Sequence, residues 1–354
     1  MRLTNLQSNA KVNILIESRS RMKQIKRILQ ILIPLALAAI LFWWVYKDMD
    51  FSKLGKVFRD GLHYEWFLVS FLLSTLSMII RGLRWQLLID PVCPGGRRQI
   101  TVLSIFVGYA ANLLLPRAGE VVRCGVLKKS DGLSFTRTFG TVITERVFDV
   151  ICLFVITLGT ILFQLGFFHN FLRENPESQD KLIHMATSPV IWGGLLAVVV
   201  IFFLFRRHMK RFSFYEKLNG LFVKLWEGMK SITTMKHPML FIFYSVLIWF
   251  IYFLMFYIGK YFFSFDVPLG VLAMLSGFVM GSFGVVAPVQ GGIGAYHFMV
   301  IFTLVFYGIS KPDAEIFALV IHGIQTIFTL FTGLIAYVWL MLLNKRRNRE
   351  VIAR

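Results

Sequence analysis

The chain has 354 residues, of which 56% are hydrophobic and only 16% charged, and its mean hydropathy is +0.67. Soluble domains carry about 45–50% apolar and about 25% charged residues, so this composition excludes a soluble protein and predicts an integral membrane protein. The net charge of +19 does not indicate nucleic-acid binding, because no soluble basic domain remains once the apolar stretches are removed. Three widely spaced cysteines without a CxxC pair predict neither a disulfide framework nor a metal site, and we expect no cofactor.

The apolar stretches predict an all-α, polytopic membrane bundle. About 20 apolar residues cross the bilayer core as a helix. The six segments long enough to do so are 28–46, 64–80, 139–167, 186–205, 238–263 and 316–343. They form a single transmembrane bundle, residues 28–343, between a basic N-terminus, residues 1–27, and a basic tail, residues 344–354.

Two further apolar stretches, 99–129 and 268–309, are broken by proline and glycine. We expect each of them to enter and leave the membrane on one side, as a re-entrant helix pair. With both termini cytoplasmic, this arrangement places most of the 38 Lys and Arg residues on the inside, including those of segments 81–98 and 117–137. The charge pattern therefore predicts an inner-membrane protein, taken here as bacterial, with cytoplasmic termini.

Segment 208–235, also on the predicted inner side, has apolar residues at helical spacing among lysines and arginines. This pattern favours an amphipathic helix on the inner leaflet, whose anionic lipids attract basic side chains. The alternative is an ordinary solvated connector.

The two broken stretches resemble each other at an offset of 172 residues. Leu103, Ser104, Phe106, Val107, Pro116 and Gly119 match Leu275, Ser276, Phe278, Val279, Pro288 and Gly291. Because the two copies start from opposite sides of the membrane, they form an inverted repeat, which is a common device of transporters. The predicted helix breaks are Pro116, Gly119, Pro288, Gly291, Gly292 and Gly294. The alternative is a pair of packing kinks without a cavity.

The first charged cluster, Arg117, Glu120 and Arg123, lies beside the first break. Ionisable groups at membrane depth are rare and usually functional. Glu120 and Arg123 are three residues apart and can pair on one helical face, which leaves Arg117 to meet a phosphate with its planar fork. Alternatively, all three are loop charges that set the topology.

The second cluster, Glu145, Arg146 and Asp149, lies inside a predicted span. Glu145 and Asp149 are four residues apart and share a face, and Arg146 can pair with Asp149. A glycosidase-like acid and base is disfavoured, because the arginine stabilises charged carboxylates and an acid catalyst must hold its proton. Headgroup or structural contacts are the favoured roles, and an interfacial position of the cluster is the alternative.

The third cluster is the glycine-rich element around residues 288–297. It is not a dinucleotide fingerprint, since a βαβ context is impossible in a membrane bundle. Its polar side chains are Gln290, Tyr296 and His297, of which a lone histidine is more often hydrogen-bonded structure than catalyst. In the last span, a polar stripe predicted to face the bundle interior consists of His322, Thr326, Thr329 and Gly333.

The elements NLLLPRAGEVVR, TERVFD and PVQGGIG together resemble the transmembrane region of the lysylphosphatidylglycerol synthase family, also called flippase-like membrane proteins. The resemblance implies movement of lipids with modified headgroups between leaflets. The residues that match the family's elements are Asn112, Pro116, Arg117, Gly119, Glu120, Arg123, Glu145, Arg146, Asp149, Gly291, Gly292 and Gly294. Full-length synthases add a soluble aminoacyltransferase domain, which we do not expect here.

We therefore expect a flippase-like lipid transporter, not an enzyme. Its partners would be membrane lipids with an anionic or modified headgroup, together with an envelope biosynthesis enzyme. The alternative is a membrane-embedded transferase acting on a polyprenyl-phosphate or a glycolipid. A third hypothesis is that the protein is a non-transporting membrane partner of an envelope enzyme.

Overall fold

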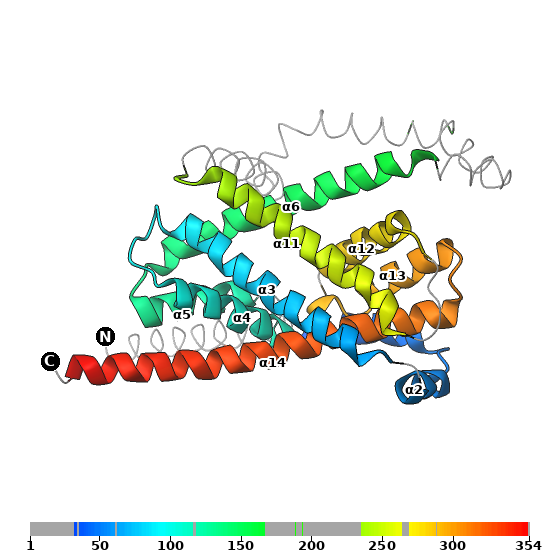
Figure 1. Cartoon of the computed structure of the whole chain (residues 1–354), viewed down its shortest axis with the longest axis horizontal. Coiled ribbons are helices and arrows are strands. Elements are labelled where there is room, and N and C mark those ends of the chain that lie inside the picture. The colour runs from blue at the N-terminus through cyan, green and yellow to red at the C-terminus, as the bar shows by residue number, and fades with distance from the viewer. Residues whose placement is uncertain are drawn as a thin grey trace, which may run out of the picture.

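The computed structural model describes residues 32–33, 35–60, 62–115, 118–166, 188, 193, 235–263, 269–287 and 289–352, and within them the chain is all-α, as predicted (Figure 1). After a helix at Leu35–Tyr46, the elements are α2 (Phe51–Asp60), α3 (Tyr64–Ile89), α4 (Arg98–Leu114), α5 (Ala118–Asp131), α6 (Phe135–Phe163), α11 (Pro238–Ile258), η1 (Gly259–Phe262), α12 (Val271–Val286), η2 (Gln290–Gly292), α13 (Ala295–Phe306) and α14 (Lys311–Ile352).

Four described helices are long and apolar enough to cross a membrane, namely Tyr64–Ile89, Phe135–Phe163, Pro238–Phe262 and Lys311–Lys345. They correspond to four of the six predicted spans, and the shorter helix Leu35–Tyr46 falls within a fifth. Many large apolar side chains on them are exposed, as expected of a surface that faces lipid. Apart from residues 188 and 193, the predicted span 186–205 lies outside the described residues, and so does the predicted amphipathic helix 208–235 apart from Met235.

The prediction for α3 needs correction at its C-terminal end. The sequence placed the end of the span at residue 80 and assigned segment 81–98 to a loop, but α3 continues to Ile89. The extension buries Arg81 and Arg84, which are 3% and 0% exposed. The helix ends just before Pro91, since proline has no backbone N–H to continue the helical hydrogen bonds. Arg81 and Arg84, which the sequence pattern assigned to a loop, are therefore interior side chains.

The two broken stretches form helical hairpins, as predicted. Helix α4 packs against α5, and α12 packs against α13. The helix bounds agree with the offset of 172 residues: shifting α4, residues 98–114, by 172 gives 270–286, and α12 covers Val271–Val286. In Figure 1 the two hairpins lie on opposite halves of the molecule, with their broken ends toward each other.

Each hairpin is held together by glycine at the contact between its helices. Gly108 and Gly119 face each other across α4 and α5, where a Cβ atom on Gly119 would lie 2.1 Å from the Gly108 carbonyl oxygen. In the second hairpin, a Cβ atom on Gly284 would lie 2.6 Å from the Cα atom of Tyr296. Side chains at these positions would force the helices apart, because real Cβ contacts are longer.

Helix α14 extends along both hairpins (Figure 1). Gly333, from the predicted polar stripe, faces the interior and packs against Ala110 of α4. Near the other end of the first hairpin, Asn344 Nδ2 donates to Ser130 Oγ at 3.0 Å. The last helix thus fixes the first hairpin at two points along its length.

Candidate functional site

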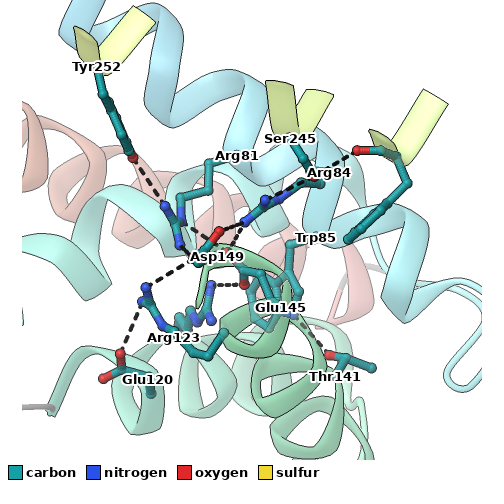
Figure 2. Close-up of polar contacts among 12 residues, drawn as sticks. Arg81, Arg84, Trp85, Glu120, Arg123, Thr141, Glu145, Asp149, Ser245 and Tyr252 are labelled. Carbon is teal, nitrogen blue, oxygen red and sulfur yellow. Dashed lines mark hydrogen bonds and ion pairs between the residues drawn. The ribbon is translucent and has the colours of Figure 1, made fainter. Parts of the chain in front are cut away.

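Seven charged side chains from α3, α5 and α6 form one ion-pair network (Figure 2). Among the described residues, its four cations and three anions leave a net formal charge of +1. The network consists of Arg81, Arg84, Arg123 and Arg146 with Glu120, Glu145 and Asp149. Five of these come from the two clusters predicted around the first break and in the third span. Arg81 and Arg84 come from the end of α3, which was not predicted to be helical.

Glu145 lies at the centre of the network and is completely buried. Its Oε1 atom lies 2.9 Å from Arg81 Nε and 3.1 Å from Arg84 Nη2, and its Oε2 atom lies 2.7 Å from Arg123 Nη1. One carboxylate thus joins α6 to both α3 and α5. Such contacts in a water-poor interior are far stronger than at a surface, but each arginine also gives up its hydration.

Asp149 repeats this arrangement one helical turn later, on the face of α6 that the sequence predicted. Its Oδ1 atom lies 2.7 Å from Arg84 Nη2, its Oδ2 atom pairs with Arg81, and Arg146 Nη1 lies 3.3 Å from Oδ2. The predicted pairing of Arg146 with Asp149 is therefore confirmed.

The outer edge of the network is a more accessible ion pair between α5 and α6. Arg146 Nη2 lies 3.0 Å from Glu120 Oε1, and the two side chains are 39% and 21% exposed. The sequence suggested a local pair between Glu120 and Arg123, but Arg123 turns inward to Glu145 instead. Tertiary partners displace the local pair because α6 presents an opposite charge to each of the two residues.

Polar groups of α11 hold the two α3 arginines in place. Arg81 Nη1 donates to the Tyr252 hydroxyl at 3.1 Å, and Arg84 Nη1 donates to Ser245 Oγ at 3.1 Å (Figure 2). The network therefore connects α3, α5, α6 and α11, and a movement of one helix changes the contacts of the others.

Arg123 has an aromatic support as well as an ionic partner. Its guanidinium carbon lies 4.4 Å from the ring centre of Trp85, within the range of a cation–π contact. The Trp85 indole N–H donates to Thr141 Oγ1 at 2.9 Å. Trp85 thus stands between the network and the start of α6.

The two hairpin tips contact each other beside this network. Gln290 Nε2 of the second tip donates to the carbonyl oxygen of Leu113 at 2.7 Å and lies 3.4 Å from that of Asn112. The Asn112 side chain itself accepts a hydrogen bond from the Gly119 backbone N–H, at 2.7 Å. Asn112 and Gln290, both predicted as ligand contacts, hold the broken backbone in this structure.

Tyr296 and His297 lie at the second tip, in a ring cluster with His322. The Gly294 N–H donates to His297 Nδ1 at 3.1 Å, and His322 Nε2 lies 3.0 Å from the Gly291 carbonyl oxygen. The rings of Tyr296 and His322 are stacked with centres 4.8 Å apart. His297 thus makes the kind of structural hydrogen bond that the sequence favoured for a lone histidine.

The glycines of the second tip have the backbone geometry that only glycine adopts easily. The φ angles of Gly291, Gly292 and Gly294 are 59°, 75° and 83°. They confirm a break in the helix at the predicted place. Three predicted residues, Pro116, Arg117 and Pro288, lie outside the described residues.

The sequence contains a signal that Arg81 and Arg84, which were not predicted as site residues, belong to the helix. Arg81 and Arg84 are three residues apart and follow an apolar run directly, and the first proline comes only at Pro91. Nothing local marks them as interior, however, because their partners lie more than 60 positions away. Among the described residues, no group of three or more His, Cys, Asp or Glu side chains is placed to hold a metal ion.

Fold and site together define a multi-pass α-helical membrane protein with two helical hairpins and a buried charge network. Comparison with known proteins agrees with this class. Residues 31–333 match the family described as the lysylphosphatidylglycerol synthase TM region, and the chain belongs to this family.

Two curated relatives are archaeal. The chain is 27% identical over 144 residues to a UPF0104 membrane protein of Pyrococcus horikoshii, a match covering 40% of this chain and 42% of the relative. It is 26% identical over 137 residues to a UPF0104 membrane protein of Methanocaldococcus jannaschii, covering 37% of this chain and 40% of the relative. The chain therefore spans about two-fifths of each relative's length. No solved structure matches this chain.

Proposed function

We propose that this protein translocates a lipid with an anionic or modified headgroup between the leaflets of its membrane. The observation that carries the proposal is the net charge of +1 in a network whose outermost arginine, Arg146, is 39% exposed. Excess positive charge inside a membrane protein is costly unless an anion is bound there for part of the time. A phosphate group supplies that anion.

Arg146 is the group proposed to meet the phosphate. Its planar guanidinium suits two parallel hydrogen bonds to phosphate oxygens. Glu120 occupies one edge of this guanidinium at 3.0 Å, so an incoming phosphate would compete with a carboxylate that is itself partly exposed. Exchange of one anion for the other gives a release step without leaving the arginine unpaired. A cationic substituent on the headgroup would then find Glu120 available.

In this proposal the two hairpins provide the route by which the lipid headgroup crosses the membrane. Broken helices expose backbone groups at membrane depth, which is tolerated where they face protein or a water-filled cavity. In this proposal the headgroup passes the meeting point of the tips, near Leu113 and Gln290, while the acyl chains remain in the surrounding lipid. We further propose a bacterial inner membrane with both termini cytoplasmic, and an envelope biosynthesis enzyme as partner.

A vesicle assay tests this proposal. The full chain is reconstituted into phosphatidylcholine vesicles with a trace of fluorescent phosphatidylglycerol, and a membrane-impermeant quencher reports how much of the probe lies outside. Wild-type protein should speed the exchange between leaflets, and Arg146→Gln should abolish it. The matched control, Arg59→Gln, alters an exposed arginine of α2 outside the network and should retain wild-type rates. Equal rates for Arg146→Gln and the wild type would overturn the site.

A further inference from the structure

A groove of about 520 Å³ opens at the end of the molecule where α3 ends and α6 begins. Its walls include Leu88, Val92, Arg137, Gly140, Thr141 and Thr144. It combines an apolar side, from the end of α3, with a polar side, from the first turns of α6. A groove of this size accommodates a headgroup and the first methylene groups of a lipid.

The polar side of the groove leads toward the charge network. Arg137, Thr141 and Thr144 are three or four residues apart, so they lie along one face of α6. Glu145 follows Thr144 directly, and the eight-residue separation between Arg137 and Glu145 spans about 12 Å along the helix. A ligand in the groove is thus separated from the network by little more than two helical turns.

Trp85 forms the connection between the two sites. Its indole N–H donates to Thr141, which lines the groove, and its ring lies under the guanidinium of Arg123 in the network. A ligand that hydrogen-bonds Thr141 therefore touches a side chain already in contact, through Trp85, with the network.

The electrostatics of this end favour an anionic ligand. The described segments around the groove carry six exposed basic residues, Arg97, Arg98, Lys128, Lys129, Arg137 and Lys236, against the acidic residues Asp90 and Asp131. Basic surface at the edge of a membrane protein attracts anionic headgroups. Within the described part of the chain, Arg137 has no ion-pair partner, and its Nη1 atom donates at 3.4 Å to the Val92 carbonyl oxygen. Its charge is available to a phosphate.

We propose that this groove is a loading subsite, in which Arg137 and Thr144 bind the phosphate of a membrane lipid before its headgroup moves to Arg146. Leu88 and Val92 contact the first methylene groups. This inference rests on the proposed function, because it supplies the step before translocation. It predicts a ligand that is both anionic and amphiphilic.

Equilibrium binding of a short-chain lipid tests the groove without any transport step. Dihexanoyl phosphatidylglycerol is titrated, below its micelle concentration, into the full chain held in a neutral detergent. Arg137→Gln should raise the Kd about fivefold, the loss expected for one partly exposed charge contact. Arg59→Gln, the control at an exposed arginine of α2 that does not line the groove, should leave the Kd unchanged. An unchanged Kd for Arg137→Gln overturns the proposal.

A second variant pair fills the groove without removing charge. A Cβ atom on Gly140 meets nothing within 4 Å, and neither does one on Gly159 later in the same helix. Gly140→Leu should raise the Kd at least tenfold by occupying the groove, whereas Gly159→Leu should have no effect. Equal Kd values for both variants contradict a ligand in the groove. Glycerol phosphate, which lacks acyl chains, should bind at least tenfold more weakly than the lipid; equal affinity contradicts an amphiphilic ligand.

The two proposals fail differently. Normal lipid binding that responds to Arg137 and Gly140, without leaflet exchange in vesicles, supports the groove and overturns the proposed function. Leaflet exchange that depends on Arg146, with lipid binding insensitive to both groove variants, overturns the groove and leaves the proposed function supported.

Discussion

Arg123 of α5 and Glu145 of α6 form an ion pair of 2.7 Å in which the side chains are 3% and 0% exposed. This pair ties the first re-entrant hairpin to a long membrane-spanning helix. Both partners would be costly alone in such a place, so the pair couples the position of the hairpin to that of α6.

Removing the central carboxylate should destabilise the fold. Glu145→Gln leaves Arg81, Arg84 and Arg123 without their shared carboxylate, and breaking a buried ion pair costs about 3–5 kcal/mol. Denaturant unfolding of the protein in detergent measures this loss. The control, Glu65→Gln, alters an exposed side chain and should leave the unfolding midpoint in place. Similar midpoints for the two variants would mean that Glu145 is not the centre of the network.

The outer ion pair should matter for transport and little for stability. Arg146 and Glu120 are partly exposed, and pairs of this kind contribute about 0–1 kcal/mol. Arg146→Gln and Glu120→Gln should therefore both fold normally. Only Arg146→Gln should stop leaflet exchange, whereas Glu120→Gln should keep it, since it removes the competitor of the phosphate. Loss of exchange in both variants would show that the pair itself, not the arginine, is required.

The close approach of α4 and α5 should not tolerate a methyl group at Gly119. Its Cβ atom would lie 2.1 Å from the Gly108 carbonyl oxygen, and overpacking of this kind costs about 1–3 kcal/mol. Gly125→Ala is the matched control on the same helix, where a Cβ atom meets nothing within 4 Å. There alanine should leave the stability unchanged or raise it, because glycine is a poor helix former. Thermal unfolding of both variants gives the comparison; destabilisation of equal size would contradict the packing described here.

The re-entrant topology predicts which engineered cysteines an impermeant thiol reagent can reach from each side. Gln99→Cys and Lys129→Cys lie at the open end of the first hairpin and should be labelled from the same side of the membrane. Glu65→Cys lies at the start of the spanning helix α3 and should be labelled from the opposite side. The parent protein gives the background labelling of its own cysteines, of which Cys93 and Cys124 are buried and Cys152 is half-buried. Labelling of Gln99→Cys and Lys129→Cys from opposite sides would show that the hairpin crosses the membrane.

Local sequence patterns were sufficient to predict the four long spans, apart from the end of α3, and the two hairpins. Length and apolarity define a span, and glycine and proline mark a break, because both effects act within a few residues. The spacing of Glu145 and Asp149 likewise fixed their common face. Each of these features depends on residues within one helix, and spacing within one helix can be read directly from the sequence.

Partner choice could not be predicted in the same way. Arg81 and Arg84 looked like loop charges at the end of a span, and Glu120 looked like the partner of Arg123. Their actual partners are on other helices, brought close by the packing of α3, α5 and α6. Long-range pairing depends on the position of whole helices, which no spacing within one segment encodes. For the same reason, the contact between Gln290 and the tip of the first hairpin could not be predicted from the sequence.

The central claim is that this protein moves a lipid and does not make one. A leaflet-resolved lipid analysis of a strain lacking the gene tests it most directly, with total lipid composition measured in parallel and the wild-type and Arg146→Gln genes returned separately. We predict an unchanged set of lipid species with one anionic or modified lipid retained in the wrong leaflet, corrected by the wild-type gene and not by Arg146→Gln. A lipid species missing from the total extract would contradict the claim and indicate a membrane-embedded transferase.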